Sequence, residues 1–163
     1  MTSQMQSKAF DEDFVQAYET HVDMLYRICI AYTKNTAEAE DVVADVFIKL
    51  LEKSPPFNDA QHQKAWLLRT AINLCKDRLK HWWRKRANID DYQHLEVTMP
   101  KSDFELIGHV MNLPERYKSA VYLYYYEGYS SQEIAEILCK PQSTILNHLS
   151  EARKMLKGVL ENE

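Results

Sequence analysis

Glycine and proline are scarce in this 163-residue chain, which has three glycines and five prolines. These two residue types interrupt regular structure and form most tight turns, so few positions allow the chain to reverse sharply. Leucine, glutamate, lysine and alanine, which favour helix, are plentiful. We therefore expect an almost wholly α-helical protein, long enough for one ordinary domain or two small ones.

Long apolar runs are also missing. No stretch approaches the roughly 20 apolar residues that span a bilayer, and the N-terminus lacks the basic and apolar segments of a signal peptide. We expect a cytoplasmic protein without membrane insertion. The chain has three cysteines, an odd number, and they lie far apart in the sequence at Cys29, Cys75 and Cys139. This argues against a disulfide framework or a chelating pair. We interpret them as buried or inert thiols.

Catalytic signatures are absent as well. The chain has no GxxxxGK[ST], GxGxxG, HExxH or GxSxG pattern. The six histidines occur singly, at His21, His62, His81, His94, His109 and His148. We predict that the protein is not an enzyme and binds neither a metal nor a cofactor.

The net charge of −4 conceals three blocks of different sign. Residues 1–60 carry five basic and eleven acidic side chains, residues 61–86 carry eight and one, and residues 87–163 carry seven and twelve. The blocks therefore have net charges of −6, +7 and −5. A short cationic block beside acidic ones indicates local phosphate contact with weak independent affinity for DNA. A further partner is expected to hold the protein on DNA.

Apolar residues recur with helical spacing in three segments of the N-terminal half. The expected helices cover residues 10–33, residues from a cap at Asn35 or Thr36 to Lys53, and residues 61–86. Their predicted apolar faces are Phe14, Tyr18, Val22, Leu25, Ile28, Cys29 and Tyr32, then Ala39, Val42, Val43, Val46, Phe47, Leu50 and Leu51, then Ala65, Leu68, Ile72, Cys75, Leu79 and Trp82. The two prolines in residues 54–59 predict a loop before the third helix.

Residues 87–102 show no sustained period and are interpreted as a linker between two domains. Further helices are expected near residues 103–112, 114–127, 131–138 and 141–160. The last of them is predicted to bury Ile145, Leu149, Ala152, Leu156 and Val159.

The segment from Glu127 to Leu149 has the pattern of a helix-turn-helix. Ser130 and Glu133 form a capping-box sequence, a three-residue turn follows, and the second helix begins with polar residues. Side chains that could reach base edges are Gln142, Ser143, Thr144, Asn147 and His148, and Arg153 and Lys154 could meet phosphates. An ordinary helical hairpin is the alternative, in which Asn147 is a solvated surface amide.

A second face of the third helix is cationic. It carries Trp66, Arg69, Asn73, Lys76, Lys80 and Arg84. Aromatic rings among basic groups suit single-stranded nucleic acid, where bases stack and cations follow the backbone. In the alternative interpretation, the tryptophans pack into the core and the charges are solvated.

Acidic residues of the second helix lie among apolar ones. Glu38, Glu40, Asp41 and Asp45 could form a partner-binding face toward a basic helix, or they could simply be solvated.

Taken in order, these segments resemble the extracytoplasmic-function sigma factors of the sigma-70 family, over roughly residues 10–86 and 103–160. Residues 39–50 are similar to the family helix that docks on the β′ clamp helices of core RNA polymerase. Residues 65–77 resemble the helix that opens and reads the −10 promoter element. The preceding loop corresponds to the segment that captures a flipped-out base. The helix-turn-helix resembles the family's second domain, which reads the −35 element and docks on the β flap.

The resemblance implies an all-α fold with two small helical domains, a sigma-2-like bundle over 1–86 and a sigma-4-like helix-turn-helix domain over 103–163, joined by a flexible linker. The implied −10 contacts are Asn58, Asp59, Lys64, Trp66, Arg69, Asn73, Lys76, Asp77, Lys80 and Arg84. The implied −35 contacts are Arg116, Ser130, Gln142, Ser143, Thr144, Asn147, His148, Arg153 and Lys154. The implied polymerase contacts are Glu40, Asp41, Asp45, Phe47 and Leu50. An anti-sigma factor is the expected regulator.

Two departures from the family pattern stand out. Cys139 occupies the turn position where the family usually has glycine, and Leu146, His148 and Glu151 stand where basic residues are common. Two competing functions remain at this point: a conventional helix-turn-helix repressor or activator, and a sigma-like mimic that binds an anti-sigma protein without DNA. The first leaves the third helix unexplained, and the basic stripe argues against the second.

Overall fold

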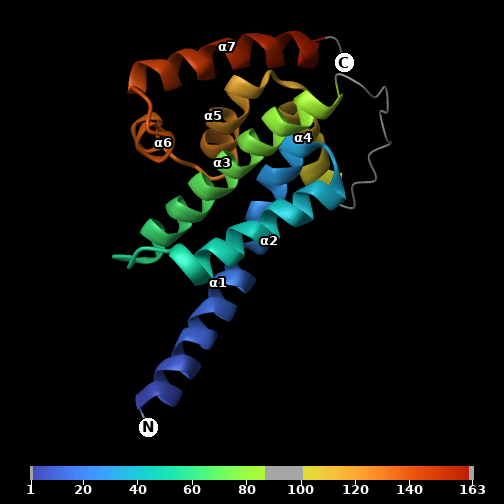
Figure 1. Ribbon diagram of the computed structural model, residues 1–163. Helices are drawn as coiled ribbons and strands as arrows, with labels where there is room; N and C mark the ends of the chain where they lie inside the picture. Colours follow the sequence, from blue (N-terminus) through green and yellow to red (C-terminus); the bar gives the residue numbers. More distant parts are fainter. Residues whose placement is uncertain (1, 87–100, 162–163) are drawn as a thin grey trace.

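The computed structural model describes the backbone of residues 2–86 and 101–161 and the side chains of residues 12–81 and 107–157. Within these ranges every regular element is a helix, which confirms the expected all-α class. The helices are α1 (Thr2–Thr33), α2 (Thr36–Lys53), α3 (Ala60–Arg86), α4 (Lys101–Asn112), α5 (Glu115–Tyr125), α6 (Ser131–Leu138) and α7 (Gln142–Glu161) (Figure 1). None of the described helices is long and apolar enough to cross a bilayer.

Local capping marks several of the helix boundaries. Asn35 caps α2, since its side-chain oxygen accepts the Glu38 N–H at 3.0 Å. The predicted capping box of α6 is present: Glu133 N–H donates to Ser130 Oγ at 3.1 Å, and Ser130 N–H donates to Glu133 Oε1 at 3.0 Å. Gly128 adopts the left-handed conformation, with φ of 72°.

Two boundaries differ from expectation. α1 begins at Thr2 rather than near residue 10, and α4 begins at Lys101, inside the segment interpreted as a linker. The two-residue difference at α4 is of the size that uncapped helix ends commonly show, whereas α1 extends eight residues beyond its expected start. The rest of the expected linker, residues 87–100, lies outside the described residues.

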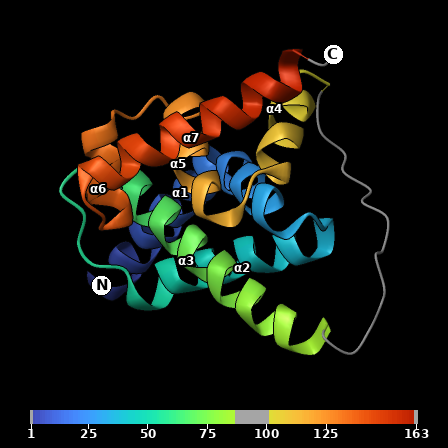
Figure 2. The same ribbon diagram turned by 90° about the horizontal axis from the view of Figure 1, so that it is seen from above.

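The C-terminal half of α1 is the centre of the packing. Leu25, the run from Ile28 to Ala31, and Tyr32 are essentially inaccessible to solvent. Consecutive buried residues point in all directions around a helix, so this part of α1 has no solvent face. α2 and α3 pack against α1, and α4 and α5 also contact it (Figure 2). The N-terminal end of α1 instead projects away from the other helices (Figure 1).

The two halves of the chain share this core and are also joined by polar contacts. The buried Lys118 Nζ of α5 donates to Ala31 O of α1 at 2.8 Å. Tyr122 OH lies 3.1 Å from Met24 O. Buried apolar residues of both halves form one continuous cluster. The sequence pattern predicted two units but not this interface.

Two residues assigned to apolar faces prove to be exposed. Tyr18 of α1 and Leu51 of α2 each have 44% of their surface accessible, and Ile48 of α2 has 48%. The apolar arc of α2 is wider than the face that α1 and α3 cover, so its edge remains in solvent. Exposed apolar groups at such an edge are suited to a partner.

Because Lys118 is buried at this interface, the free energy of unfolding should depend on pH. The pKa of Lys118 is lowered to about 8, mainly by burial and also by the nearby Lys34, while Glu115 and Cys75 act in the opposite direction. Between pH 8 and the ordinary lysine pKa of 10.5 the unfolded state therefore binds more protons at this site, and the free energy of unfolding rises with pH. A hydrogen bond to Cys75 and burial raise the pKa of Cys29, and burial raises that of Tyr122. Cys29 opposes this rise from about pH 8 and Tyr122 from about pH 9, because the folded state keeps protons that the unfolded state loses.

We therefore expect Lys118 to contribute a rise of about 1 kcal/mol to the unfolding free energy between pH 8 and 9, from which the opposing effect of Cys29 subtracts. Lys118→Met should remove most of that increase, because no buried ammonium remains to lose its proton. Urea titrations at the two pH values measure the difference. An equal increase in both proteins would mean that another group is responsible.

Candidate nucleic-acid interface

The outward face of α3 carries the predicted cationic stripe. Arg69, Asn73, Asp77 and Lys80 are exposed along it, at helical spacings of three and four, and Lys76 is half-buried beside them. Burial and the nearby Lys140 lower the pKa of Lys76. Lys76 thus faces the helix-turn-helix half. The side chain of Arg84, also predicted for this stripe, lies outside the described side chains.

An aromatic cluster forms where the loop enters α3. The ring of Phe57 lies 5.3 Å from that of His62 and 5.7 Å from that of Trp66, both edge-on. His62 N–H donates to Asp59 Oδ1 at 2.8 Å, and Asn58 N–H donates to His62 Nδ1 at 3.1 Å. The loop is therefore fastened to the first turn of the helix, with Asp59 as its cap.

Phe57 and His62 lie in the loop of about residues 57–64 that was expected to capture a base, but they were not among the individually predicted contacts. The available signal was the four-residue spacing of His62 and Trp66, together with an apolar residue directly after two prolines. Predicted contacts Asn58, Asp59 and Trp66 do gather at this point, with Trp66 half-buried against Phe57.

Lys64, predicted to contact DNA, is engaged within the protein. Its ammonium lies 2.9 Å from Glu127 Oε2 and 5.5 Å from the ring centre of Tyr129, both in the C-terminal half. The Glu127 side chain is only 8% exposed. A cavity of about 640 Å³ opens beside this pair, lined by α1, the start of α3 and Glu127. In this arrangement the Lys64 ammonium is paired with Glu127.

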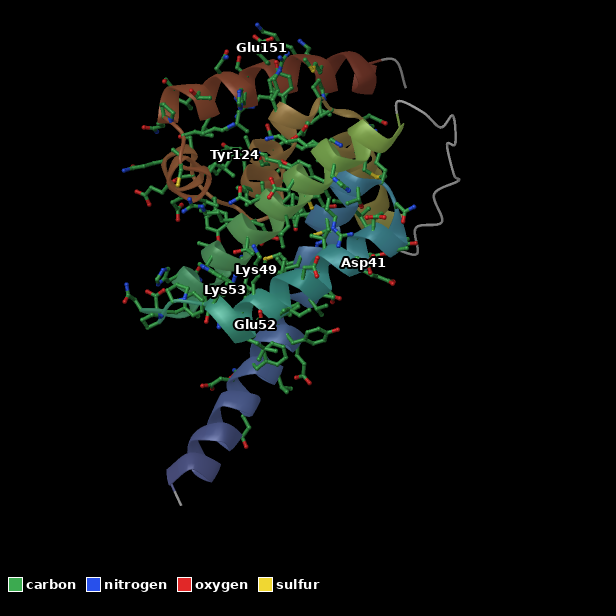
Figure 3. All side chains as sticks on the ribbon, in the orientation of Figure 1. Asp41, Lys49, Glu52, Lys53, Tyr124 and Glu151 are labelled. Carbon is green, nitrogen blue, oxygen red and sulfur yellow. The ribbon has the colours of Figure 1, made fainter. Side chains whose placement is uncertain are left out.

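The acidic side of α2 is partly neutralised by α3. Arg78 lies 2.9 Å from Glu38 Oε2, 2.9 Å from Asp45 Oδ2 and 3.7 Å from Asp41 Oδ2. The Asp41 side chain is 68% exposed, and Figure 3 shows it on the outside of α2. Glu40 is also exposed. Asp41 and Glu40 are therefore the acids most available to a partner.

Phe47 and Leu50, predicted as partner contacts, belong instead to the core and are 4% and 7% exposed. The ring of Phe47 lies 4.8 Å from that of Tyr18 and 6.0 Å from that of Phe14. The large apolar side chains that solvent reaches on α2 are their neighbours Ile48 and Leu51.

The helix-turn-helix is formed by α6 and α7. Cys139, with φ of 54° and ψ of 46°, ends α6 in the left-handed conformation. Lys140 N–H then donates to Ala135 O at 3.0 Å. Gln142 Nε2 donates to Ser131 Oγ at 3.0 Å, which ties the start of α7 to that of α6.

The predicted −35 residues do not all share one surface. Gln142, Ser143 and Asn147 are exposed on the first turns of α7, and Thr144 is half-buried. His148 turns toward α5, where its ring lies 5.4 Å from that of Tyr117. Burial lowers the pKa of His148, and Lys140, Arg116 and Lys76 lower it further.

The remaining predicted −35 residues have partners within the chain. Arg153 Nε donates to Tyr125 OH at 2.9 Å, and its guanidinium lies 5.6 Å from the ring centre of Tyr124. Lys154 pairs with Glu151 at 3.3 Å and is largely exposed. The Arg116 guanidinium lies 4.8 Å from the Tyr117 ring centre. The hydroxyl of Ser130 is occupied in the capping box.

Among the described side chains, no group of three or more His, Cys, Asp or Glu residues gathers to hold a metal ion.

Comparison with known proteins finds two matching sequence families. The family described as Sigma-70 region 2 matches residues 17–86, and the family described as Sigma-70, region 4 matches residues 109–156. The first match contains α2 and α3, and the second contains the helix-turn-helix.

Individual relatives cover most of the chain. It is 30% identical to the ECF RNA polymerase sigma-E factor of Haemophilus influenzae, over 74% of each protein. It is 26% identical to the ECF RNA polymerase sigma factor SigW of Bacillus subtilis, over 96% of this chain and 94% of SigW. The fold is similar to that of the sigma factor RpoE of Bartonella quintana, solved with the anti-sigma factor NepR, with a TM-score of 0.76, 22% identity, and coverage of 92% and 98%.

The left-handed backbone at Cys139, in the turn of the helix-turn-helix, should lower the stability of the protein. A side chain at a left-handed position costs roughly 1 kcal/mol, and glycine avoids this cost. We expect Cys139→Gly to raise the free energy of unfolding by about 0.5–1 kcal/mol. Cys139→Ala is the matched control, since it removes the thiol and keeps the Cβ. If urea titration shows equal gains for both variants, the thiol rather than the backbone is responsible.

Proposed function

Because the chain belongs to the extracytoplasmic-function sigma factors of the sigma-70 family, we propose that it joins core RNA polymerase and directs it to promoters by contacting two separated DNA elements. One observation carries this proposal. The same chain has a cationic helix, α3, with an aromatic cluster at its start, and a second helix, α7, whose first turns expose polar side chains suited to base recognition. A sigma factor supplies promoter selection, and the core enzyme supplies catalysis.

The downstream contact is assigned to α3 and the loop before it. Arg69 and Lys80 are placed to follow the phosphate backbone, and Asn73 lies between them with an amide that can bond a base edge. The Phe57, His62 and Trp66 cluster offers ring surfaces beside Asn58, where an unstacked base can be held. Stacking of a displaced base offsets part of the cost of opening the duplex, so no nucleotide hydrolysis is required.

The polymerase contact is assigned to the outer side of α2. Glu40 and Asp41 supply negative charge, and Ile48 and Leu51 supply exposed apolar surface on the same helix. The expected partner surface is the clamp helices of the β′ subunit. Arg78 holds the α2 acids against α3, so the polymerase-binding helix and the DNA-binding helix move as one unit.

The upstream contact is assigned to α7, with Gln142, Ser143 and Asn147 facing outward. Lys154 is exposed further along the helix and is placed for phosphate. Docking of this half on the β flap would hold it at promoter spacing from α3. Each DNA contact then needs only modest affinity, which accounts for the acidic net charge of the chain.

Regulation by an anti-sigma factor also fits the packed arrangement. The Bartonella relative was solved with such a partner. In this chain the two halves are joined through Lys64 and Glu127, so a downstream contact of Lys64 requires their separation. A partner that stabilises the packed state would therefore lower promoter binding.

The proposal is tested by transcription of fragmented genomic DNA with bacterial core polymerase, with and without the protein, and mapping of every RNA start. Starts that need the protein and share two spaced upstream motifs support it. Sequence-specific DNA binding by the protein alone, without new starts, would identify a repressor or activator instead.

Reversing the charge at Asp41 should weaken assembly with core polymerase. We expect Asp41→Lys to raise the dissociation constant for core about tenfold, because a desolvated acidic contact becomes a repulsion. Glu136→Lys on α6 is the matched control, with the same charge change at an exposed position outside this surface. Fluorescence anisotropy of labelled protein titrated with core measures both, and circular dichroism checks helical content. Similar affinities for the two variants would place the interface elsewhere.

Loss of the Asn73 amide should impair promoter opening more than polymerase binding. We expect Asn73→Ala to reduce open-complex formation about tenfold, as removal of one good base contact costs roughly 1–3 kcal/mol. Permanganate reactivity of unpaired thymines measures opening, and anisotropy measures core binding. Glu19→Ala, exposed on α1, serves as the control. Equal losses of opening and core binding would contradict the separate roles of α2 and α3.

A further inference from the structure

Leu146 is the most exposed large apolar residue among the described side chains, with 52% of its surface accessible. It lies in the second turn of α7, directly after Ile145, which is fully buried. The packing face of α7 continues through Leu149 and Ala152, both about 1% exposed. Leu146 therefore points away from the face by which α7 is held.

The outward face around Leu146 is otherwise polar and uncharged. Its exposed residues are Gln142, Ser143, Leu146, Asn147 and Ser150. They recur at helical spacing, so they share one side of the first three turns of α7. No lysine or arginine is among them, and the bidentate contact that most often selects guanine is therefore unavailable on this face.

An isobutyl side chain neither donates nor accepts hydrogen bonds, so it cannot bind phosphates or the polar edges of bases. The major groove offers one apolar group at a base edge, the C5-methyl of thymine. We propose that Leu146 reads a thymine of the upstream promoter element by packing against that methyl group. This inference rests on the proposed function, since it requires that α7 enter the groove.

A protein partner for Leu146 is the weaker alternative. The other large exposed apolar side chains described in this half are Tyr124, Tyr125 and Met155. Arg153, which binds the two tyrosines, and Met155 lie seven and nine residues further along α7, a rise of about 10 Å or more. Leu146 is thus a single apolar group among amides and hydroxyls, whereas protein interfaces bury a contiguous apolar centre.

The test uses the assembled holoenzyme and a promoter identified by start mapping. Each thymine of the upstream element is replaced singly by deoxyuridine, which removes only the methyl group. Holoenzyme binding to each template is then measured by competition. We expect one replacement to weaken binding by the unmodified protein about fourfold, the value for one buried methyl-sized group.

Variants connect that effect to the side chain. Leu146→Ala should weaken binding to the thymine template by a similar factor and should show no further loss on the sensitive deoxyuridine template. Met155→Ala is the matched control, as an exposed apolar residue of the same helix outside the proposed face. It should retain the full fourfold sensitivity.

Distinct results overturn the proposal. If the unmodified holoenzyme binds every deoxyuridine template equally well, no thymine methyl group is contacted. If Leu146→Ala keeps the same sensitivity to deoxyuridine, another residue makes the methyl contact. Weaker association of Leu146→Ala with core polymerase in the absence of DNA would make Leu146 a protein contact. In all these cases promoter-specific starts persist, whereas their absence would reject the proposed function itself.

Discussion

Burial of the last turns of α1 is the constraint on which the rest of the structure depends. Because Ile28 to Tyr32 have no solvent face, helices from both halves of the chain are needed to cover them. α2 and α3 supply part of the cover, and α4 and α5 supply the rest. Separating the halves would expose apolar surface of α1 and also break the contact of Lys118 with Ala31. The packed arrangement is thus stabilised by contacts at the buried end of α1.

Charge opposes part of this stabilisation. The packed halves bring Lys76 of α3 near Lys140, and His148 near Lys140, Arg116 and Lys76. Like charges held together favour states in which they separate or meet an anion. Lys64 and Glu127 act in the opposite sense, as an attractive pair between the halves. The interface therefore combines apolar burial, the Lys64–Glu127 ion pair and a crowded cationic margin, a balance that a nucleic-acid or protein partner can shift.

The sequence predicted those features that neighbouring residues encode. The cap at Asn35, the capping box of Ser130 and Glu133, and the outward stripe of α3 follow from spacings of three and four residues. The side-chain hydrogen bonds could not be predicted in this way, because they join residues far apart in the sequence. Arg78 and Asp45 are 33 positions apart, and Arg153 and Tyr125 are 28 positions apart. The inward turn of His148 and the burial of Phe47 depend on the same long-range packing. Local pattern thus placed residues on faces, while tertiary contacts decided which of them remain available.

The uncharged outward face of the first three turns of α7 has a consequence for behaviour at different ionic strengths. Contacts between cations and phosphates weaken steeply as salt is added, because the release of counterions from DNA into a more concentrated solution gains less entropy. Alkyl and amide contacts to base edges are hardly screened. Added salt should therefore lower the occupancy of all promoters together while leaving their rank order nearly unchanged. A cell whose internal salt fluctuates would keep the same choice of genes and alter only how strongly they are read.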